Sequence, residues 1–357
     1  MLMLGIETSC DETSAAVVSE TGGRWTIGSN IVASQVNIHR EWGGVVPELA
    51  SRQHIRDICG VVRTALDTAQ TDLRQLDAIA VTQGPGLVGS LLVGVSFAKS
   101  LALSLDRPLV PVHHLAGHIE SLFLEHGDIA LPLVALVVSG GHTSLYVVRE
   151  PGRYERIGRT RDDAAGEAYD KVAKLLGLGY PGGPIVDKRA RNGNDEAIAF
   201  PVTRMTHADR NAPHMKGDLD FSFSGLKTAV LRHVRQRAES SSAEARVCEG
   251  GPLTEREIDD ICASFQRVVV STLLDRVFDA ADRYHAQSVG IAGGVSANAR
   301  LRADFARQAE RRGIPAYVPH ISLSTDNAAM IAAAGLRNFH AGKRAGLDLN
   351  ADASLQL

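Results

Sequence analysis

The sequence predicts an α/β protein made of two similar lobes, and three observations support this fold class. A chain of 357 residues is long enough for two domains of ordinary size. Short apolar runs typical of strands alternate with longer segments typical of helices. An apolar strand, a polar or Gly-rich tip and a returning apolar strand occur twice, at residues 3–18 and 133–148, and each hairpin opens a half of similar length. We therefore expect a duplicated α/β domain.

Composition places the protein among ordinary globular chains. Hydrophobic residues make up 44% and charged residues 22%, and the net charge of −3 restricts any phosphate-binding surface to a local patch. The four cysteines form no C-x-x-C pair, which suits a reducing cytosol. The N-terminus lacks the basic segment of a signal peptide. The most apolar helical segment, Leu87 to Leu105, is interrupted by Lys99, so we expect a core helix, no membrane span and a cytoplasmic protein.

The two hairpin tips are candidate phosphate sites. The first tip, Glu7 to Ser14, offers backbone N–H groups and hydroxyls, although an ordinary polar hairpin has the same pattern. The second tip, Ser139 to Thr143, contains Gly140 and Gly141, which allow a ligand to approach the backbone closely. Two such tips, facing each other from two lobes, would hold the phosphate chain of a nucleotide between them.

A glycine-rich turn follows the strand at Leu76 to Val81 and precedes a helix at Ser90 to Leu105. Its glycines at 84, 86 and 89 match the G-x-G-x-x-G pattern of dinucleotide sites. The next strand, however, ends in His113-His114 rather than in an acidic residue, and Pro85 removes a backbone donor. A strand-to-helix turn is therefore the better interpretation.

Two histidines after the strand at Pro108 to Val112 form a candidate metal site. His114 and His118 stand four residues apart and would share one face of a helix. Neutral imidazoles at this spacing can chelate iron or zinc, although paired helix histidines also occur as simple hydrogen-bonding residues. Asp326 stands at the expected N-cap of the last helix, Asn327 to Leu336, which is an ordinary role for aspartate. It is also the candidate third ligand.

The second half offers carboxylates beside an irregular loop. A helix predicted from Asp163 to Leu176 contains Asp170, and the segment from Gly177 to Pro184 is expected to be irregular. Asp187 follows on another short helix. Asp170 and Asp187 flank the loop and could accept hydrogen bonds from ribose hydroxyls, although solvated or capping carboxylates show the same pattern.

Asn298 follows a strand and a Gly293-Gly294 turn, at the start of a helix. Such a turn places a ligand at a helix N-terminus, where the Asn298 amide could reach a nucleotide. Nucleic-acid binding is less visible. Arg-rich segments at 149–161, 188–191 and 204–216 could form a phosphate track, and no aromatic stacking platform stands out. Residues 238–256 read as a polar linker.

Six separated motifs, in order, closely resemble the TsaD family, and the resemblance covers residues 4–339. The motifs are Gly5-Ile6-Glu7-Thr8-Ser9-Cys10-Asp11-Glu12-Thr13, the His114/His118 pair, Val138-Ser139-Gly140-Gly141-His142-Thr143, Asp170 with Gly182-Gly183, Gly293-Gly294-Val295-Ser296-Ala297-Asn298 and Ser324-Thr325-Asp326-Asn327. The resemblance implies the fold of actin, Hsp70 and the sugar kinases, with a nucleotide cleft between two lobes. The first lobe would span 1–130, with the helix at 326–340 returning to it. The second would span 131–325, with an irregular insertion at about 200–256.

The resemblance also implies an activity: transfer of a threonylcarbamoyl group from threonylcarbamoyl-adenylate to N6 of the tRNA adenosine directly 3′ of the anticodon, which forms t6A. It implies an iron(II) ion, with zinc as an alternative, on His114, His118 and Asp326. It implies an adenylate site formed by Val137, Val138, Ser139, Gly140, Gly141, Asp170, Gly183, Asp187 and Asn298. Bacterial members work with the proteins TsaB and TsaE. In this chemistry Asp11 is a candidate to assist proton removal.

Three other functions remain open at this point. A zinc metalloprotease would need H-E-x-x-H, but Leu115 follows His114, so the general base is missing. A sugar kinase or ATPase of the same fold would need a bound triphosphate, and the sequence has no P-loop. A scaffold that only binds nucleotide would have no use for the two histidines and the aspartate.

Overall fold

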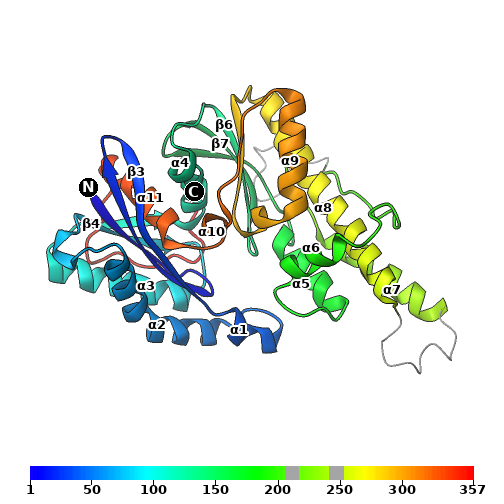
Figure 1. Ribbon diagram of the computed structural model, residues 1–357, viewed down its shortest axis with the longest axis horizontal. Coiled ribbons are helices and arrows are strands. Elements are labelled where there is room, and N and C mark those ends of the chain that lie inside the picture. Colours follow the sequence, from blue (N-terminus) through cyan, green and yellow to red (C-terminus); the bar gives the residue numbers. More distant parts are fainter. Residues whose placement is uncertain (206–216, 241–252) are drawn as a thin grey trace.

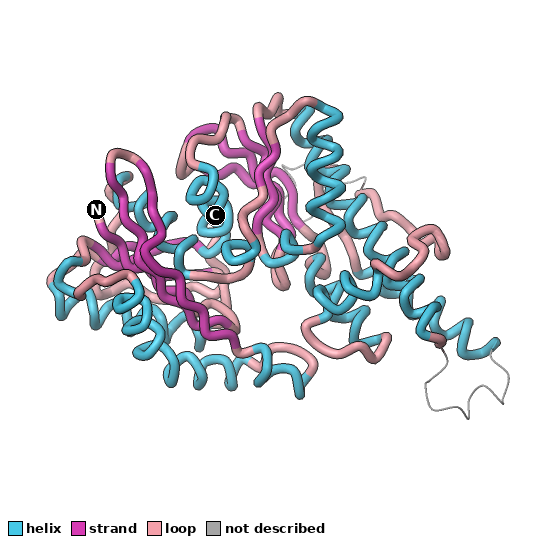
Figure 2. The backbone as a smooth tube through the Cα atoms, viewed as in Figure 1, coloured by secondary structure: helices cyan, strands magenta, loops and turns pink. Residues whose placement is uncertain are grey.

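The computed structural model describes residues 1–205, 217–240 and 253–357, and these residues form two α/β lobes side by side (Figure 1). Each lobe has a five-stranded sheet at its centre, and helices cover the sheets (Figure 2). Part of the predicted insertion and most of the predicted linker lie outside the described residues.

The first sheet has the strand order β3-β2-β1-β4-β5. Its strands are β1 (Leu2–Glu7), β2 (Glu12–Thr21), β3 (Arg24–Ser34), β4 (Ala78–Gly84) and β5 (Leu109–His113). β1, β2 and β3 form an antiparallel meander, and β4 and β5 continue the sheet parallel to β1. The first hairpin tip therefore lies between β1 and β2, at the edge of the sheet where β1 and β4 end.

The second sheet has the order β10-β9-β6-β7-β8, which repeats the plan of the first. Its strands are β6 (Leu133–Val138), β7 (Thr143–Glu150), β8 (Arg153–Arg159), β9 (Ser288–Ala292) and β10 (Ala316–Tyr317). Again three strands form an antiparallel meander, and two further strands run parallel to the first of them. The predicted duplicated α/β fold is confirmed.

Helices cover both faces of the first sheet because its strand residues alternate between two apolar clusters. Leu4, Ile6 and Val17 pack on one face with α2 (Pro47–Thr68) and α3 (Val88–Leu105). Met3, Ala16 and Val18 pack on the other face with α11 (Ala328–His340). A Cβ at Gly5 would lie 2.3 Å from the carbonyl oxygen of Ala328. Glycine on β1 and alanines on α11 therefore permit a close approach of helix and sheet.

One helix, α4 (His114–His126), lies between the two sheets. Leu115, Ile119 and Leu122 pack against the second sheet in one apolar cluster, and α4 also contacts α11 of the first lobe. Its apolar residues are thus shared between two partners, which explains why most of the helix is buried. α4 carries both candidate metal-ligand histidines into the boundary between the lobes.

The outer face of the second sheet carries the remaining long helices: α5 (Ala165–Leu175), α6 (Gly182–Ala190), α7 (Ser224–Ser240), α8 (Glu255–Arg283) and α9 (Ala299–Arg312). Helix α8 is the centre of this layer, with Phe265, Val269 and Leu273 fully buried. It begins with a capping box, in which Thr254 accepts a hydrogen bond from the backbone N–H of Glu257. Short helical turns include α1 (Val36–His39), η1 (Arg40–Trp42) and α10 (Ile321–Ser324).

Helix α3 is long and apolar enough to cross a membrane by length and composition alone. In the fold it packs against α2 and the first sheet through Leu91, Val95 and Ala98, which are buried. Lys99 on the same helix donates to the carbonyl oxygen of Leu349 in the C-terminal segment. This packing is the arrangement expected of a core helix.

Several local predictions were wrong. The segment expected to be irregular up to Pro184 already forms the first turn of α6, which begins at Gly182. The N-cap of α11 is Asn327, whose side chain accepts from the backbone N–H of Met330, so Asp326 is left outside the helix. Strands β3 and β8 were not predicted. Both are outer strands with many half-exposed or exposed residues, and they lack the apolar runs of the central strands.

Candidate functional site

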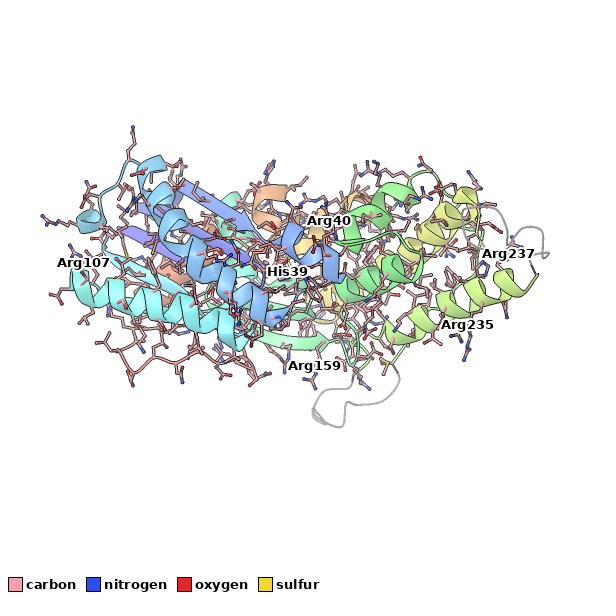
Figure 3. The ribbon with its side chains drawn as sticks, turned by 90° about the horizontal axis from the view of Figure 1, so that it is seen from below. His39, Arg40, Arg107, Arg159, Arg235 and Arg237 are labelled. Atoms are coloured by element: carbon pink, nitrogen blue, oxygen red, sulfur yellow. The ribbon has the colours of Figure 1, made fainter. Side chains whose placement is uncertain are left out.

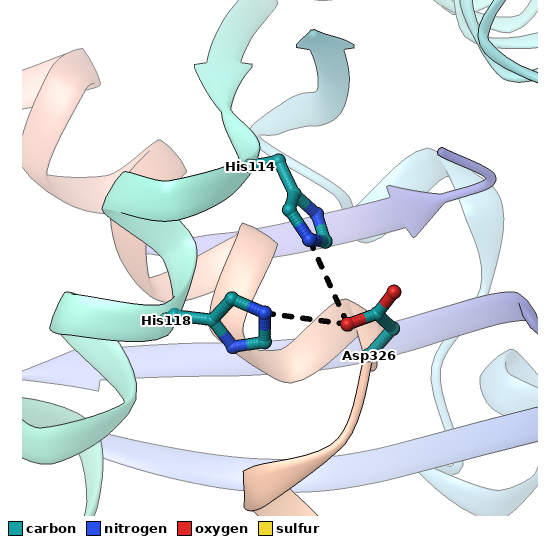
Figure 4. Close-up of side chains that lie close together, drawn as sticks. All are labelled: His114, His118 and Asp326. Carbon is teal, nitrogen blue, oxygen red and sulfur yellow. Dashed lines mark ion pairs between the residues drawn. The ribbon is translucent and has the colours of Figure 1, made fainter. Parts of the chain in front are cut away.

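His114, His118 and Asp326 converge at the boundary between the lobes (Figure 4). Oδ1 of Asp326 lies 3.2 Å from Nε2 of His118 and 3.6 Å from Nε2 of His114. One ligand atom from each residue lies within 4.8 Å of the others. The three side chains that the sequence singled out therefore form one possible metal-binding triad.

The local sequence explains why the triad forms. β5 ends at His113, whose Nδ1 accepts from the backbone N–H of Leu115 and so caps α4. The two ligand histidines follow on the first two turns of α4 and face the same way. Asp326 precedes the Asn327 cap of α11, and α11 packs against α4, which brings the carboxylate to the imidazoles.

His114 is held by groups from the first hairpin tip. Its Nδ1 lies 3.1 Å from Oε2 of Glu7 and 3.2 Å from Oγ of Ser9. Glu7 is fully buried, and it also accepts from the hydroxyl of Thr82 at 2.7 Å and from the backbone N–H of Ser9. A carboxylate on Nδ1 keeps the proton there and leaves Nε2 free to bind a cation. Sequence reasoning missed Glu7 because it looked like part of a phosphate loop.

The charges of the triad are strongly coupled. Burial alone would lower the pKa of His114, but the carboxylates of Asp326 and Glu7 raise it to about 9. Burial lowers the pKa of His118. Burial would raise the pKa of Asp326, yet the neighbouring His114 and His118 hold it well below its usual range. Without a metal, the site therefore favours an ionised carboxylate beside a protonated His114.

The donor set fits a divalent transition metal. Neither ring nitrogen of the fully buried His118 makes a hydrogen bond within the described residues, although Nε2 is close to Asp326. An imidazole whose nitrogens make no hydrogen bond is expensive to bury unless a ligand completes it. The separations of 3.2 and 3.6 Å match neighbouring ligands around one ion at bond lengths of about 2.0–2.2 Å. Two imidazoles and one carboxylate leave coordination positions open for a substrate.

A cleft of about 980 Å³ opens beside the triad. Both hairpin tips contribute to its walls, together with the turn at Pro85 to Leu87 and the segment that starts at Gly294. Its volume suits a nucleotide-sized ligand. The C-terminal segment closes one side: Ala353 lines the cleft, and the carbonyl oxygen of Leu355 accepts from Nε2 of His113 at 3.1 Å. No motif in the sequence indicated this role of the C-terminal segment.

Most of the predicted substrate residues line this cleft. They are Ser139, Gly140, Gly141, Asp170, Gly183, Asp187 and Asn298. The predicted catalytic Asp11 also lines the cleft, with His114 and Asp326 of the triad. Val137 and Val138 are fully buried within β6 and stand behind the cleft wall. Gly293 has a φ of +92°, and a Cβ there would lie 2.5 Å from the carbonyl oxygen of Val138. This turn needs glycine to bring the Asn298 segment beside the second tip.

The predicted carboxylates have specific partners. Oδ1 of Asp170 accepts from the backbone N–H of Gly182 at 2.7 Å, but burial raises the pKa of Asp170 to about 6. Asp187 and Asn298 are joined through Gln266, which donates to Asp187 at 3.2 Å and accepts from Asn298 at 2.8 Å. Gln266 lies on α8, far from either residue in sequence, and no motif could have indicated it.

His142 is a further group that sequence reasoning left unassigned. It belongs to the second tip, lines the cleft, and its ring centroid lies 6.4 Å from that of His114. Burial, with the nearby His114 and His118, lowers the pKa of His142 to about 4. It therefore presents a neutral imidazole to the cleft at neutral pH. Its place in the motif from Val138 to Thr143 was the available signal in the sequence.

Comparison with known sequences matches this chain to one protein family. Residues 26–333 match the sequence model of TsaD, described as tRNA N6-adenosine threonylcarbamoyltransferase. Proteins with that name from Symbiobacterium thermophilum and Koribacter versatilis are 52% and 48% identical to this chain. Each alignment covers 100% of this chain and 97% or 99% of the relative, respectively. A relative from Anaeromyxobacter dehalogenans is 51% identical, with 99% of each chain covered.

Comparison with solved structures identifies the fold. Full-length HypF, in a phosphate- and nucleotide-bound form, matches with a TM-score of 0.56 and 14% identity, over 94% of this chain and 55% of HypF. Component A of the (R)-2-hydroxyglutaryl-CoA dehydratase from Acidaminococcus fermentans matches with a TM-score of 0.50 and 13% identity, over 94% and 96% of the two chains. The two-lobed chain thus has the fold of the actin, Hsp70 and sugar-kinase group, as the sequence predicted.

Proposed function

The chain belongs to the TsaD family of tRNA N6-adenosine threonylcarbamoyltransferases, and from this premise we propose how its cleft performs the transfer. The activity is transfer of the threonylcarbamoyl group of threonylcarbamoyl-adenylate to N6 of the adenosine directly 3′ of the anticodon, which forms t6A. Membership of a transferase family sets aside the protease, kinase and scaffold alternatives.

We propose that the adenylate half of the donor lies between the two hairpin tips. The N–H groups of Gly140 and Gly141 and the hydroxyl of Ser139 would hold the phosphate, in a place where no side chain blocks the approach. Asp170, Asp187 and Asn298 would surround the nucleoside, with Gly183 lining the pocket beneath it. Val137 and Val138, behind the wall, keep this tip rigid. Gln266 fixes both Asp187 and Asn298, so the nucleoside side of the site is preorganised.

We propose that His114, His118 and Asp326 hold an iron(II) ion, with zinc as the alternative. The ion would supply Lewis-acid polarisation of a donor oxygen, which stabilises negative charge at the carbamoyl group. Glu7 orients His114, and burial of His118 keeps its imidazole neutral and ready to act as a ligand. The triad borders the cleft, so the carbamoyl group would lie between it and the entering adenine.

The transfer forms one bond and breaks one. The lone pair of the adenine N6 attacks the carbamoyl carbon, the bond from that carbon to the phosphate oxygen breaks, and AMP leaves with the electron pair. The amine loses one proton in the process. We propose that Asp11, at the first tip and on the cleft wall, accepts or positions that proton.

tRNA is the acceptor substrate of this family. We propose that TsaB and TsaE assist this chain, as the resemblance implies, and that the reaction takes place in the cytoplasm. A net charge of −3 supports shared recognition, because this chain lacks a global positive field to attract tRNA.

The observation that carries this proposal is the buried triad at the wall of a nucleotide-sized cleft. The test is a transfer assay with the purified chain, its partners, labelled threonylcarbamoyl-adenylate and unmodified tRNA, with elemental analysis of the metal. We expect the wild type to label tRNA, and His114→Ala to lose both the metal and the transfer. His126→Ala, at the far end of the same helix, is the matched control and should retain both.

The outcomes separate the parts of the proposal. Label that stays on the adenylate with all partners present would contradict the transfer mechanism. Transfer that persists in metal-free protein would preserve the activity and remove the role given to the triad.

A further inference from the structure

The mouth of the cleft carries an exposed tryptophan. We define the mouth loop as residues 39–45, which contain η1 and the glycine pair after it. Gly43, Gly44 and Val45 line the cleft, and Trp42 directly precedes them. Trp42 is 63% exposed and is the only aromatic among the exposed large apolar side chains of the described residues. An exposed indole therefore stands next in sequence to residues that line the cleft.

The backbone of the mouth loop is fixed, although its tip is exposed. His39 is fully buried: its Nε2 bonds with Oε1 of Gln35, and its Nδ1 accepts from the backbone N–H of Val46. Gly43 adopts the left-handed conformation, with a φ of +67°, and ends η1. Trp42 is therefore presented on a short anchored turn, and an exposed aromatic on such a support loses little entropy when it binds.

Two positive side chains that make no ion pair among residues 1–205, 217–240 and 253–357 lie near Trp42. Arg40, on the same turn, is exposed, and Figure 3 shows it on the edge of the first lobe that faces the helices of the second. Lys174 of α5 reaches the mouth from the second lobe: a Cβ built on Gly43 would lie 3.8 Å from its Nζ. Neither Arg40 nor Lys174 makes an ion pair within the described residues, whereas neighbouring Lys171 and Arg191 are paired with carboxylates.

An exposed indole near two cations that form no ion pair in the described part of the chain fits an unpaired nucleic-acid strand. Bases stack on aromatic side chains, and Arg and Lys neutralise the flanking phosphates. A duplex would hide its bases inside the stack and offer the indole no face. The acceptor adenosine belongs to a loop, where bases are unpaired, so a neighbouring base is available to stack on an indole beside the cleft.

We propose that Trp42 stacks on an unpaired base of the tRNA anticodon loop next to the target adenosine, and that Arg40 and Lys174 contact the adjoining phosphates. This inference rests on the proposed function for the identity of the RNA. It assigns an RNA-binding surface to the mouth loop and to the first lobe, in addition to the Arg-rich segments considered from the sequence. Stacking reads no base edge, so this contact tolerates different loop sequences.

Fluorescence tests the stacking without requiring catalysis. The chain has two tryptophans. The second, Trp25, lies under the guanidinium of Arg337, whose Cζ is 4.7 Å from the centroid of the Trp25 ring. We expect an unmodified anticodon stem-loop RNA to quench the emission of the wild type. Trp42→Phe, which retains Trp25, should show little quenching at the same RNA occupancy, measured by anisotropy of labelled RNA. Equal quenching in both proteins, or binding without quenching in the wild type, would overturn the stacking contact.

Steady-state kinetics with the partner proteins give a second test. Trp42→Ala should raise the KM for tRNA by about 5- to 150-fold, the range expected for loss of one stacked base, and leave kcat and metal content near wild type. Trp42→Phe should recover most of the affinity, because it keeps an aromatic face. Leu347→Ala, which removes another exposed apolar side chain, is the control and should behave as wild type.

Salt dependence tests the two cations. Arg40→Gln with Lys174→Gln should reduce the slope of log affinity against log salt by about 1.4, since each phosphate contact to a single strand contributes roughly 0.7. Arg24→Gln with Arg311→Gln removes two positive charges elsewhere and should leave the slope unchanged. An unchanged KM in Trp42→Ala, with transfer still dependent on His114, would overturn this inference and leave the proposed function intact. Absence of transfer in the wild type, with quenching by the anticodon stem-loop RNA that still depends on Trp42, would overturn the proposed function and retain the RNA-binding contact.

Discussion

Oε2 of Glu7 lies 3.1 Å from Nδ1 of His114 and joins two residues that are 107 positions apart in the chain. Glu7 ends β1, and His114 begins α4 directly after β5. Both strands belong to the first sheet, with β4 between them, so the sheet itself sets the distance. A carboxylate behind a ligand imidazole fixes its tautomer and direction, which is a frequent feature of metal sites.

Glu7→Gln should therefore weaken metal binding. An amide keeps the size of the side chain but is a poorer acceptor for the Nδ1 proton, and we expect a 10- to 100-fold loss of affinity, roughly the effect of removing such a partner. Titration with cobalt(II), followed by its absorption spectrum, measures this directly. Glu150→Gln, an exposed charge on β7, is the control. Unchanged affinity would mean that Glu7 has only a structural role.

Asp11→Asn should lower kcat and leave the binding of metal and donor near wild type. Asp11 lines the cleft but is not part of the triad, and an amide cannot accept the proton that the adenine amine loses. We expect a fall of about 10²- to 10⁴-fold in single-turnover transfer, the usual contribution of a general base. Turnover equal to that of the wild type would remove Asp11 from the mechanism.

Arg337→Ala should destabilise the contact between α4 and α11. Arg337 donates to the fully buried carboxylate of Glu120 at 2.9 Å, and the hydroxyl of Tyr154 donates to the same group at 2.7 Å. Without Arg337, a buried charge loses its partner. Because Arg337 is a quarter exposed, we expect a loss of free energy of unfolding at the lower end of about 3–5 kcal/mol, measured by urea denaturation.

The double variant Glu120→Leu with Arg337→Met is the control for that prediction. It removes both charges together and should be clearly more stable than Arg337→Ala. Equal stability of the two variants would show that the contact of the Arg337 guanidinium with the Trp25 ring, which both variants lose, stabilises this contact rather than the ion pair.

Asp170→Asn should change how stability depends on pH. Burial raises the pKa of Asp170 to about 6, above its ordinary value of 3.8, so the folded protein binds the proton more tightly than the unfolded chain. The resulting contribution to stability is present below pH 3.8 and is lost as pH rises through about 6. Asparagine keeps the acceptor for Gly182 and avoids the buried charge. Relative to wild type, the variant should thus gain stability as pH rises from 4 to 7.

Urea denaturation of both proteins across this pH range measures the difference. Other carboxyl groups titrate in both proteins and cancel in the comparison. A stability difference that stays constant between pH 4 and pH 7 would contradict the raised pKa of Asp170.

The repeated fold and most of the residues of the site could be predicted from the sequence alone. The two hairpins could be predicted because in each an apolar strand, a tip with Gly, Ser or Thr and a second apolar strand follow one another directly. These signals are local in the sequence. The His114/His118 pair was readable for the same reason, since a helix puts residues four apart on one face. Asp326 was expected at a helix cap and was also a candidate third ligand, and the resemblance to the family supported the second role.

Which distant groups meet depends on tertiary packing and could not be predicted from the sequence. Packing of α11 against α4 brings Asp326 to the histidines, and the order of strands in the first sheet brings Glu7 behind His114. The mouth loop faces Lys174 because the two lobes stand side by side. No periodic pattern or residue spacing in the sequence indicates any of these contacts. They depend on how buried apolar faces fit together, and that fit is a property of the whole chain rather than of any segment.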